Sequence, residues 1–163
     1  MNSDLSKIKN IRSKKKFTIS LAESCTGGMI SKYLTSINGS SLFFNGACIS
    51  YSNQMKIRLL EVSKNTIINY GAVSHQTALA MVKGLKKITD SEILLSVTGV
   101  AGPSGGTLRT PVGCVFFGIG SKINKKYTFK TTKKIFHEKT RHAIQKKSTE
   151  YAMYLILKEL KKI

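Results

Sequence analysis

The sequence predicts an α/β fold in which helices cover both faces of a mixed sheet. Short apolar runs typical of buried strands alternate with segments whose apolar residues recur at helical spacing. Glycine-rich turns follow two of the apolar runs, at 24–28 and 98–106, where open α/β sheets carry their binding loops. The 163 residues contain no internal repeat and no linker-like stretch. We therefore expect a single domain over residues 1–163.

The first third of the chain predicts two strands and two helices. Apolar residues three positions apart favour a short helix over 4–13. The apolar run 17–22 predicts a strand, and the turn after it leads into a helix over 29–37. A second strand is expected over 43–51, where small residues allow close packing.

Three further helices are expected because a serine that can cap a helix stands before each of them. These helices are predicted over 53–60, 64–69 and 75–88, after Ser52, Ser63 and Ser74. The last has the clearest amphipathic pattern, with lysines on the face opposite its apolar residues.

The second half of the chain predicts the remaining strands and a closing helix. The apolar run 93–97 reads as a buried strand, and 112–119 as another. Polar and apolar residues alternate over 126–131, which indicates an antiparallel edge strand joined to its neighbour through a hairpin at 121–124. A final helix is expected from about His142.

The charge is strongly positive, with 27 Lys and Arg against 8 Asp and Glu. Such a surface suits nucleic acids because binding releases their counterions. However, only four of the 27 cations are arginine, the lysines are scattered, and no nucleic-acid-binding motif is present. We therefore expect no specific nucleic-acid partner, and attraction of small anionic substrates instead.

The apolar stretches and cysteines bear on the cellular setting. No stretch has the roughly 20 apolar residues that span a bilayer, and no signal peptide is recognisable. The chain has three cysteines, an odd number, and they lie far apart at Cys25, Cys48 and Cys114. This pattern argues against a disulfide framework. A cytoplasmic protein without a membrane partner is expected.

The turn at 24–28 is the first candidate site. Ser24 stands between a strand and a helix, where free N–H groups and the positive end of a helix meet. An electrophilic carbonyl or a phosphate would suit this place. The alternative is structural, because Ser24 or Thr26 could simply cap the helix. Cys25 is a rival nucleophile beside Ser24.

A lysine and a tyrosine complete the candidate chemistry. Lys56 is expected in the first turn of a helix, where the helix end and burial both favour the uncharged amine. A neutral amine can take a proton from a serine hydroxyl. Tyr51 would end the preceding strand. Lys56 could equally be one surface lysine among 23, and Tyr51 a strand aromatic. The three histidines lack metal-ligand spacing, so no metal is expected.

Several blocks in one order resemble the C-terminal domain family of the competence/damage-inducible protein CinA, which also occurs alone as nicotinamide-nucleotide amidase. They are AESCTGG at 22–28, YSN at 51–53 with Lys56, YGAVS at 70–74, TGVAGP at 98–103, GG at 105–106 and PVG at 111–113. The resemblance implies a three-layer α/β/α sandwich with a mainly parallel sheet and an antiparallel edge hairpin. It also implies a homodimer.

The activity implied by the resemblance is hydrolysis of nicotinamide mononucleotide to nicotinate mononucleotide and ammonia, without a cofactor or metal. Ser24 matches the nucleophile, Lys56 the group that activates it, and Tyr51 the neighbouring phenol. The alternative within the same fold is a catalytically silent nucleotide-binding or competence-related module.

Substrate contacts are expected from two turns and one arginine. The turn residues after the nucleophile would hold the developing oxyanion. The phosphate would be held by the second glycine loop and by Arg141, which matches a family arginine at the entry to the last helix. These residues are Cys25, Thr26, Gly27, Gly28, Gly102, Gly105, Gly106 and Arg141. The chain departs from the family pattern at Ser104, Thr110 and Lys139-Thr140.

Overall fold

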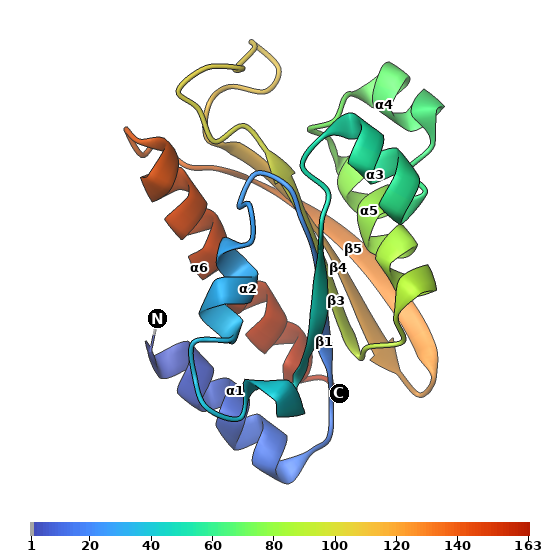
Figure 1. Cartoon of the computed structure of the whole chain (residues 1–163), viewed down its shortest axis with the longest axis vertical. Coiled ribbons are helices and arrows are strands. Elements are labelled where there is room, and N and C mark those ends of the chain that lie inside the picture. Colours follow the sequence, from blue (N-terminus) through green and yellow to red (C-terminus); the bar gives the residue numbers. More distant parts are fainter. Residues whose placement is uncertain (1) are drawn as a thin grey trace.

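The computed structural model describes residues 2–163 and contains a five-stranded sheet with helices on both faces (Figure 1). The strands lie in the order β2-β1-β3-β4-β5. Their bounds are β1 Ile19–Glu23, β2 Phe44–Ile49, β3 Ile93–Gly99, β4 Cys114–Ile123 and β5 Lys126–Ile135. Met1, which the predicted domain included, lies outside the described residues.

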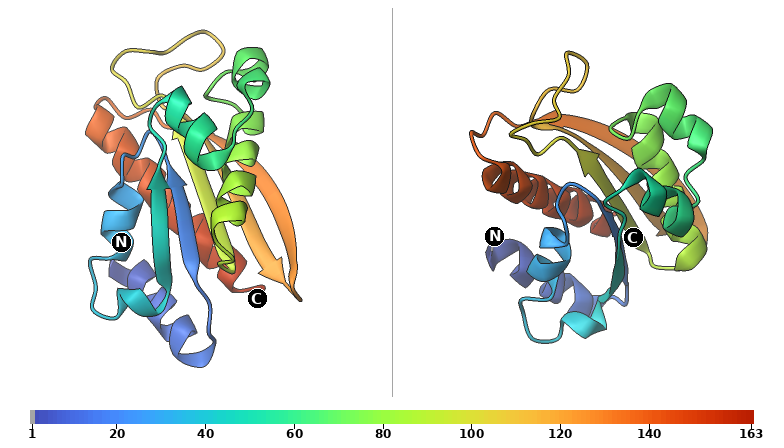
Figure 2. Two further views of the ribbon diagram at one scale, coloured as in Figure 1. Left: turned by 45° about the vertical axis from the view of Figure 1, so that its right-hand side comes forward. Right: turned by 45° about the horizontal axis from the view of Figure 1, so that its top comes forward.

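Figure 2 shows that the helices form one layer on each face of the sheet. One layer consists of α1 (Asn2–Lys14), α2 (Met29–Leu34) and α6 (Arg141–Leu160), and the other of α3 (Asn53–Leu60), α4 (Lys64–Tyr70) and α5 (His75–Ile88). A short 3₁₀ turn, Ser40–Leu42, precedes β2. The predicted three-layer α/β/α arrangement is confirmed.

The strand directions confirm a mixed sheet with an edge hairpin. β1 pairs with β2 and with β3 in parallel, whereas β3–β4 and β4–β5 are antiparallel. Four strands thus run one way and β4 alone the other. The sheet is mainly parallel in strand direction, although two of its four strand pairings are parallel and two are antiparallel. The carboxyl ends of β1, β2 and β3 therefore meet at one edge, where the loops after them can form a site.

The core explains why β1 and β3 read as continuous apolar runs. Both are buried between the two helical layers, and every residue of β1 is buried. The larger apolar cluster joins β1 and β3 to α1, α2 and α6, and the smaller one joins them to α3 and α5. A strand covered on both faces has no polar side to alternate with its apolar side.

The serine caps formed as the sequence indicated. The side chains of Ser52, Ser63 and Ser74 accept hydrogen bonds from the third residue of the following helix in each case. The expected hairpin connection at 121–124 was too long, because β4 continues to Ile123 and the turn consists of Asn124 and Lys125 alone. Both turn residues have positive φ (50° and 63°), as a type I′ hairpin turn requires.

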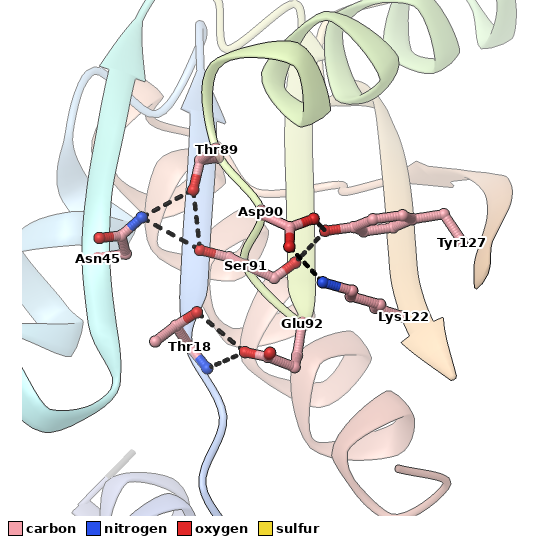
Figure 3. Close-up of polar contacts among 8 residues, drawn as sticks. All are labelled: Thr18, Asn45, Thr89, Asp90, Ser91, Glu92, Lys122 and Tyr127. Atoms are coloured by element: carbon pink, nitrogen blue, oxygen red, sulfur yellow. Dashed lines mark hydrogen bonds and ion pairs between the residues drawn. The ribbon is translucent and has the colours of Figure 1, made fainter. Parts of the chain in front are cut away.

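A polar network fastens the edge of the sheet opposite the carboxyl ends of β1 and β3 (Figure 3). Glu92, just before β3, accepts hydrogen bonds from the Thr18 N–H (2.7 Å) and hydroxyl (3.0 Å). The Tyr127 hydroxyl lies 3.1 Å from Asp90 Oδ1 and 2.9 Å from the Ser91 carbonyl oxygen. These contacts tie the loop before β3 to β1 and to the hairpin.

None of the helices in residues 2–163 combines the length and the apolar character that crossing a bilayer requires. The longest, α6, carries lysines and glutamates along its 20 residues.

Gly84 sets the distance between α5 and the end of α3. A Cβ placed on Gly84 would lie 1.8 Å from the Leu60 carbonyl oxygen, so the helix cannot accept a side chain here without moving. We expect Gly84→Ala to lower the free energy of unfolding by about 1–3 kcal/mol through overpacking, measured by denaturant unfolding. Lys83→Ala, at the exposed neighbouring position, should stay within about 0.5 kcal/mol of wild type. Equal stability of Gly84→Ala and wild type would contradict this close approach.

Candidate active site

A pocket of about 290 Å³ opens at the carboxyl edge of the parallel strands. Its walls come from the turn after β1, the junction between β2 and α3, the connection between α4 and α5, the loop after β3, and the start of α6. Of the predicted site residues it is lined by Ser24, Cys25, Tyr51, Lys56, Gly102, Gly105 and Arg141. Five separate segments of the sequence therefore meet in one cavity.

Ser24 does not cap the following helix. The N-cap of α2 is Gly28, which has a left-handed backbone (φ 96°) and no side-chain capping bond. The Ser24 side chain instead points toward Lys56 and the Tyr51 carbonyl oxygen. Gly27, also at positive φ (59°), gives the turn a shape that other residues adopt poorly. The capping interpretation of Ser24 and Thr26 is wrong.

Lys56 is held against Ser24 by the start of α3. Its ammonium nitrogen, Nζ, lies 2.9 Å from Ser24 Oγ, 2.9 Å from the Ser50 carbonyl oxygen and 3.1 Å from the Tyr51 carbonyl oxygen. Because Cα–Cβ bonds in a helix tilt toward its N-terminus, a lysine in the first turns reaches back over the residues before the helix. Only 2% of Lys56 is exposed, so it is not a surface lysine.

These three contacts suit both protonation states of the lysine. The ammonium has three protons for three acceptors. The neutral amine has two protons, which the two carbonyl oxygens accept, and its lone pair then faces the Ser24 hydroxyl. Burial lowers the pKa of Lys56 to about 8, because a charged amine loses solvation there. No carboxylate in residues 2–163 forms an ion pair with it.

Tyr51 and Arg141 form a pair at the rim of the pocket. One guanidinium nitrogen of Arg141 donates to the Tyr51 hydroxyl oxygen (2.7 Å), and another donates to the Gly102 carbonyl oxygen (2.8 Å). Arg141 thereby joins α6 to the loop after β3 and to the end of β2. Since the Tyr51 oxygen accepts from Arg141, its own proton remains available to a ligand.

Cys25 lines the pocket beside Ser24 but is a poor nucleophile. Its side chain is buried, and burial raises the pKa of the thiol to about 12. The reactive thiolate is therefore scarce near neutral pH. The Cys25 carbonyl oxygen accepts a hydrogen bond from Gln145 of α6 (2.9 Å), which fixes the turn from the other side.

Four predicted binding residues do not line the pocket. The Thr26 hydroxyl and the Gly28 N–H donate to the Glu23 carboxylate, and the Gly27 N–H donates to the Ser24 carbonyl oxygen. Gly106 instead packs against Val112. Gly27 and Gly28 thus have no free N–H for an oxyanion. In the turn after Ser24, the N–H groups of Cys25 and Thr26 have no acceptor outside their own residues.

The residues that depart from the family pattern lie in three different parts of the structure. Ser104 lines the pocket. The Thr110 hydroxyl lies 2.9 Å from that of Thr107 in the exposed part of the same loop. Thr140 accepts from the Ala143 N–H and so caps α6, the helix that begins with Arg141.

Sequence reasoning missed several residues that shape the site. Asn53 and Thr98 line the pocket, and the Ser50 carbonyl oxygen helps to hold Lys56. Like Asn53 and Thr98, Glu23 lies within a family block without a predicted role, although a glutamate inside a buried strand is rare enough to attract notice. Among residues 2–163, no three His, Cys, Asp or Glu side chains gather as metal ligands.

The fold and the pocket define an α/β protein with a lysine-partnered serine at the carboxyl edge of its sheet. The sequence profile of the CinA C-terminal domain matches residues 3–160, and the chain belongs to that family. This confirms the resemblance seen in the sequence.

Relatives and solved structures agree with this membership. A CinA-like protein of Petrotoga mobilis is 47% identical over 145 residues, which cover 89% of this chain and 35% of that protein. A putative competence-damage inducible protein of Alkaliphilus metalliredigens is 46% identical over 149 residues, which cover 91% of this chain and 35% of that protein. The chain thus spans about a third of the length of these relatives.

The crystal structure of the competence/damage inducible protein CihA from Agrobacterium tumefaciens superposes with a TM-score of 0.87 at 31% identity. The match covers 95% of this chain and 92% of that one. A CinA superfamily protein of Klebsiella pneumoniae superposes with a TM-score of 0.89 at 23% identity, and the match covers 99% of this chain and 98% of that one. At this identity the similarity supports the fold alone.

Proposed function

We propose that this protein is a serine amidohydrolase that converts nicotinamide mononucleotide to nicotinate mononucleotide and ammonia, in salvage of pyridine nucleotides. The observation that carries the proposal is the 2.9 Å contact between Lys56 Nζ and Ser24 Oγ inside a pocket. A buried lysine with a pKa of about 8 is a suitable base for a serine hydroxyl near neutral pH.

The first half of the reaction forms an acyl-enzyme. Neutral Lys56 takes the hydroxyl proton of Ser24 while Ser24 Oγ attacks the carboxamide carbon. The carbonyl oxygen becomes an oxyanion, for which the N–H groups of Cys25 and Thr26 are the candidate donors. The Lys56 ammonium then gives its proton to the amide nitrogen, the carbon–nitrogen bond breaks, and ammonia leaves.

The second half of the reaction releases the acid. Water enters where ammonia left, and neutral Lys56 removes a proton from it as it attacks the ester carbon. The bond to Ser24 breaks, and the serine recovers its proton. The proton of Tyr51 is not used by Arg141, and we assign Tyr51 as a donor to the leaving nitrogen or to the oxyanion.

The pocket has two basic side chains, Lys56 and Arg141, and Arg141 is the one that stays charged in the reaction. Lys56 is hydrogen-bonded to Ser24, so the phosphate would lie toward Arg141 and the loop that carries Gly102 and Gly105. Arg141 already donates to two protein oxygens, but a guanidinium has five N–H donors and can reach a phosphate with the others.

Incubation with nicotinamide mononucleotide tests the proposal directly. We expect ammonia and nicotinate mononucleotide to appear in equal amounts, followed by coupled ammonia detection and by chromatography of the nucleotide. Binding of the nucleotide without release of ammonia would reject the amidase and favour the catalytically silent module.

A further inference from the structure

A buried carboxylate beside Ser24 takes no part in the reaction described above. Glu23, the last residue of β1, has no exposed surface and forms no ion pair within residues 2–163. It is satisfied by five hydrogen bonds from the turn and from the start of α2. The donors are Thr26 Oγ1 (2.6 Å), Gly28 N (3.0 Å), Ile30 N (3.3 Å), Ser31 N (2.8 Å) and Ser31 Oγ (2.5 Å).

The backbone of the same residue is fixed from the sheet. Glu23 stands opposite Ile49 of β2 and Val97 of β3 in the strand register. Its carbonyl oxygen accepts the Ser50 N–H at 2.8 Å. Glu23 therefore holds the end of β1 through its backbone and the start of α2 through its side chain. Ser24 lies in the turn between these two anchors.

We propose that Glu23 is a positioning residue for Ser24, whose carboxylate braces the turn so that the serine hydroxyl faces Lys56. The proposal rests on Ser24 being the nucleophile of the proposed function. Ser24 itself has few polar restraints, because its hydroxyl forms hydrogen bonds only with Lys56 and the Tyr51 carbonyl oxygen among the described residues. Its direction is set by the backbone of the turn, and Glu23 fixes that backbone.

The same carboxylate decides which N–H groups remain for the substrate. Glu23 accepts the N–H groups of Gly28, Ile30 and Ser31, so the start of α2 is already occupied by an internal anion. A substrate phosphate is therefore excluded from it. Among the N–H groups that directly follow the nucleophile, those of Cys25 and Thr26 remain for an oxyanion.

A glutamine at this position cannot replace the carboxylate. One oxygen of Glu23 accepts from Ser31 N and Oγ, and the other accepts from Thr26 Oγ1, Gly28 N and Ile30 N. Whichever oxygen becomes an amide nitrogen, its N–H₂ faces at least one backbone N–H donor. The turn must open or the side chain must leave its place, and Ser24 moves in either case.

The test compares Glu23→Gln with a matched variant, Glu92→Gln. Glu92 also accepts a backbone N–H and a hydroxyl, both from Thr18 at the opposite end of β1 (Figure 3). Reactivity of Ser24 is measured with phenylmethanesulfonyl fluoride and mass spectrometry. Ser24 Oγ bonds to sulfur, fluoride leaves, and the hydroxyl proton passes to Lys56. Circular dichroism gives the folded fraction, to which each labelling rate is normalised.

We expect folded Glu23→Gln to be labelled about 100-fold more slowly than wild type, since a displacement near 1 Å has effects of this size. Its kcat for ammonia release should fall with KM little changed. Glu92→Gln should be labelled within about twofold of wild type, because this substitution lowers the stability of the protein but does not displace Ser24. Labelling of Glu23→Gln within threefold of wild type, or equal slowing in both variants, would overturn the proposal.

Two further outcomes separate this proposal from the proposed function. A wild-type protein that is labelled at Ser24 but releases no ammonia would reject the substrate, while the labelling rates would still decide the role of Glu23. A wild-type protein that is not labelled would overturn the proposal, because Ser24 would not be a nucleophile.

A milder variant covers the case in which Glu23→Gln does not fold. Ser31→Ala removes one of the five donors and leaves the backbone contacts of the carboxylate in place. We expect labelling to slow several-fold. An unchanged rate in Ser31→Ala, together with an unfolded Glu23→Gln, would show that the carboxylate serves stability alone and would overturn the proposal.

Discussion

Replacing Ser24 with alanine should reduce ammonia release from nicotinamide mononucleotide by at least about 1,000-fold, as removal of a nucleophile does in serine hydrolases. The hydroxyl provides the atom that bonds to the carboxamide carbon, and no other group in the pocket replaces it. Cys25, its neighbour, is held as a thiol with a pKa of about 12. The measurement is steady-state ammonia production at saturating substrate, with nucleotide binding followed by calorimetry.

A matched control is Ser63→Ala, which removes a serine that caps α4 and does not line the pocket. This variant should lose about 1 kcal/mol of stability and keep the wild-type turnover per folded molecule. Ser24→Ala should bind the nucleotide with nearly wild-type affinity. Turnover of Ser24→Ala within tenfold of wild type would exclude Ser24 as the nucleophile.

The general position of the site could be predicted from the sequence because local signals there agree with each other. Ser52 caps α3 and places Lys56 in the first turns of that helix, and the bounds Asn53–Leu60 were predicted to the residue. Ser24 and Tyr51 follow two neighbouring parallel strands. The carboxyl ends of such strands meet, so their proximity follows from strand order once the sheet is known.

The hydrogen-bond partners within the site could not be predicted in this way. The backbone of the turn bends so that the Glu23 carboxylate accepts the Gly28 N–H. That N–H group, which was expected to bind the substrate, is therefore not available to it. The Arg141 side chain crosses from α6 to Tyr51 over 90 residues of sequence. Such contacts depend on how helices pack across the sheet, and no spacing in a single sequence encodes that packing.

Replacing Lys56 with methionine should reduce turnover by about 100- to 10,000-fold, the range for loss of a general base. Methionine has nearly the length of lysine and fills the same buried space, but it cannot accept the Ser24 proton. The wild-type enzyme should gain activity with pH as the amine loses its proton. With the pKa of Lys56 lowered to about 8, kcat/KM should rise about tenfold per pH unit below 8 and level off above it. An inflection near 10.5, the ordinary lysine value, would contradict an effect of burial.

The same lysine makes stability depend on pH in a direction that can be measured independently of catalysis. The pKa is lower in the folded protein (about 8) than the ordinary value of 10.5, so between these values the unfolded chain binds more protons. Stability therefore rises with pH across this window, whereas below it Lys56 lowers stability by an amount that no longer changes with pH. A shift of 10.5 − 8 = 2.5 units corresponds to about 3 kcal/mol. The free energy of unfolding of wild type should rise by about this amount relative to Lys56→Met between pH 8 and 10.5, since all other titrations cancel. A constant difference between the two proteins would mean that Lys56 is as basic in the pocket as in water, and it would remove the physical reason for its role as a base.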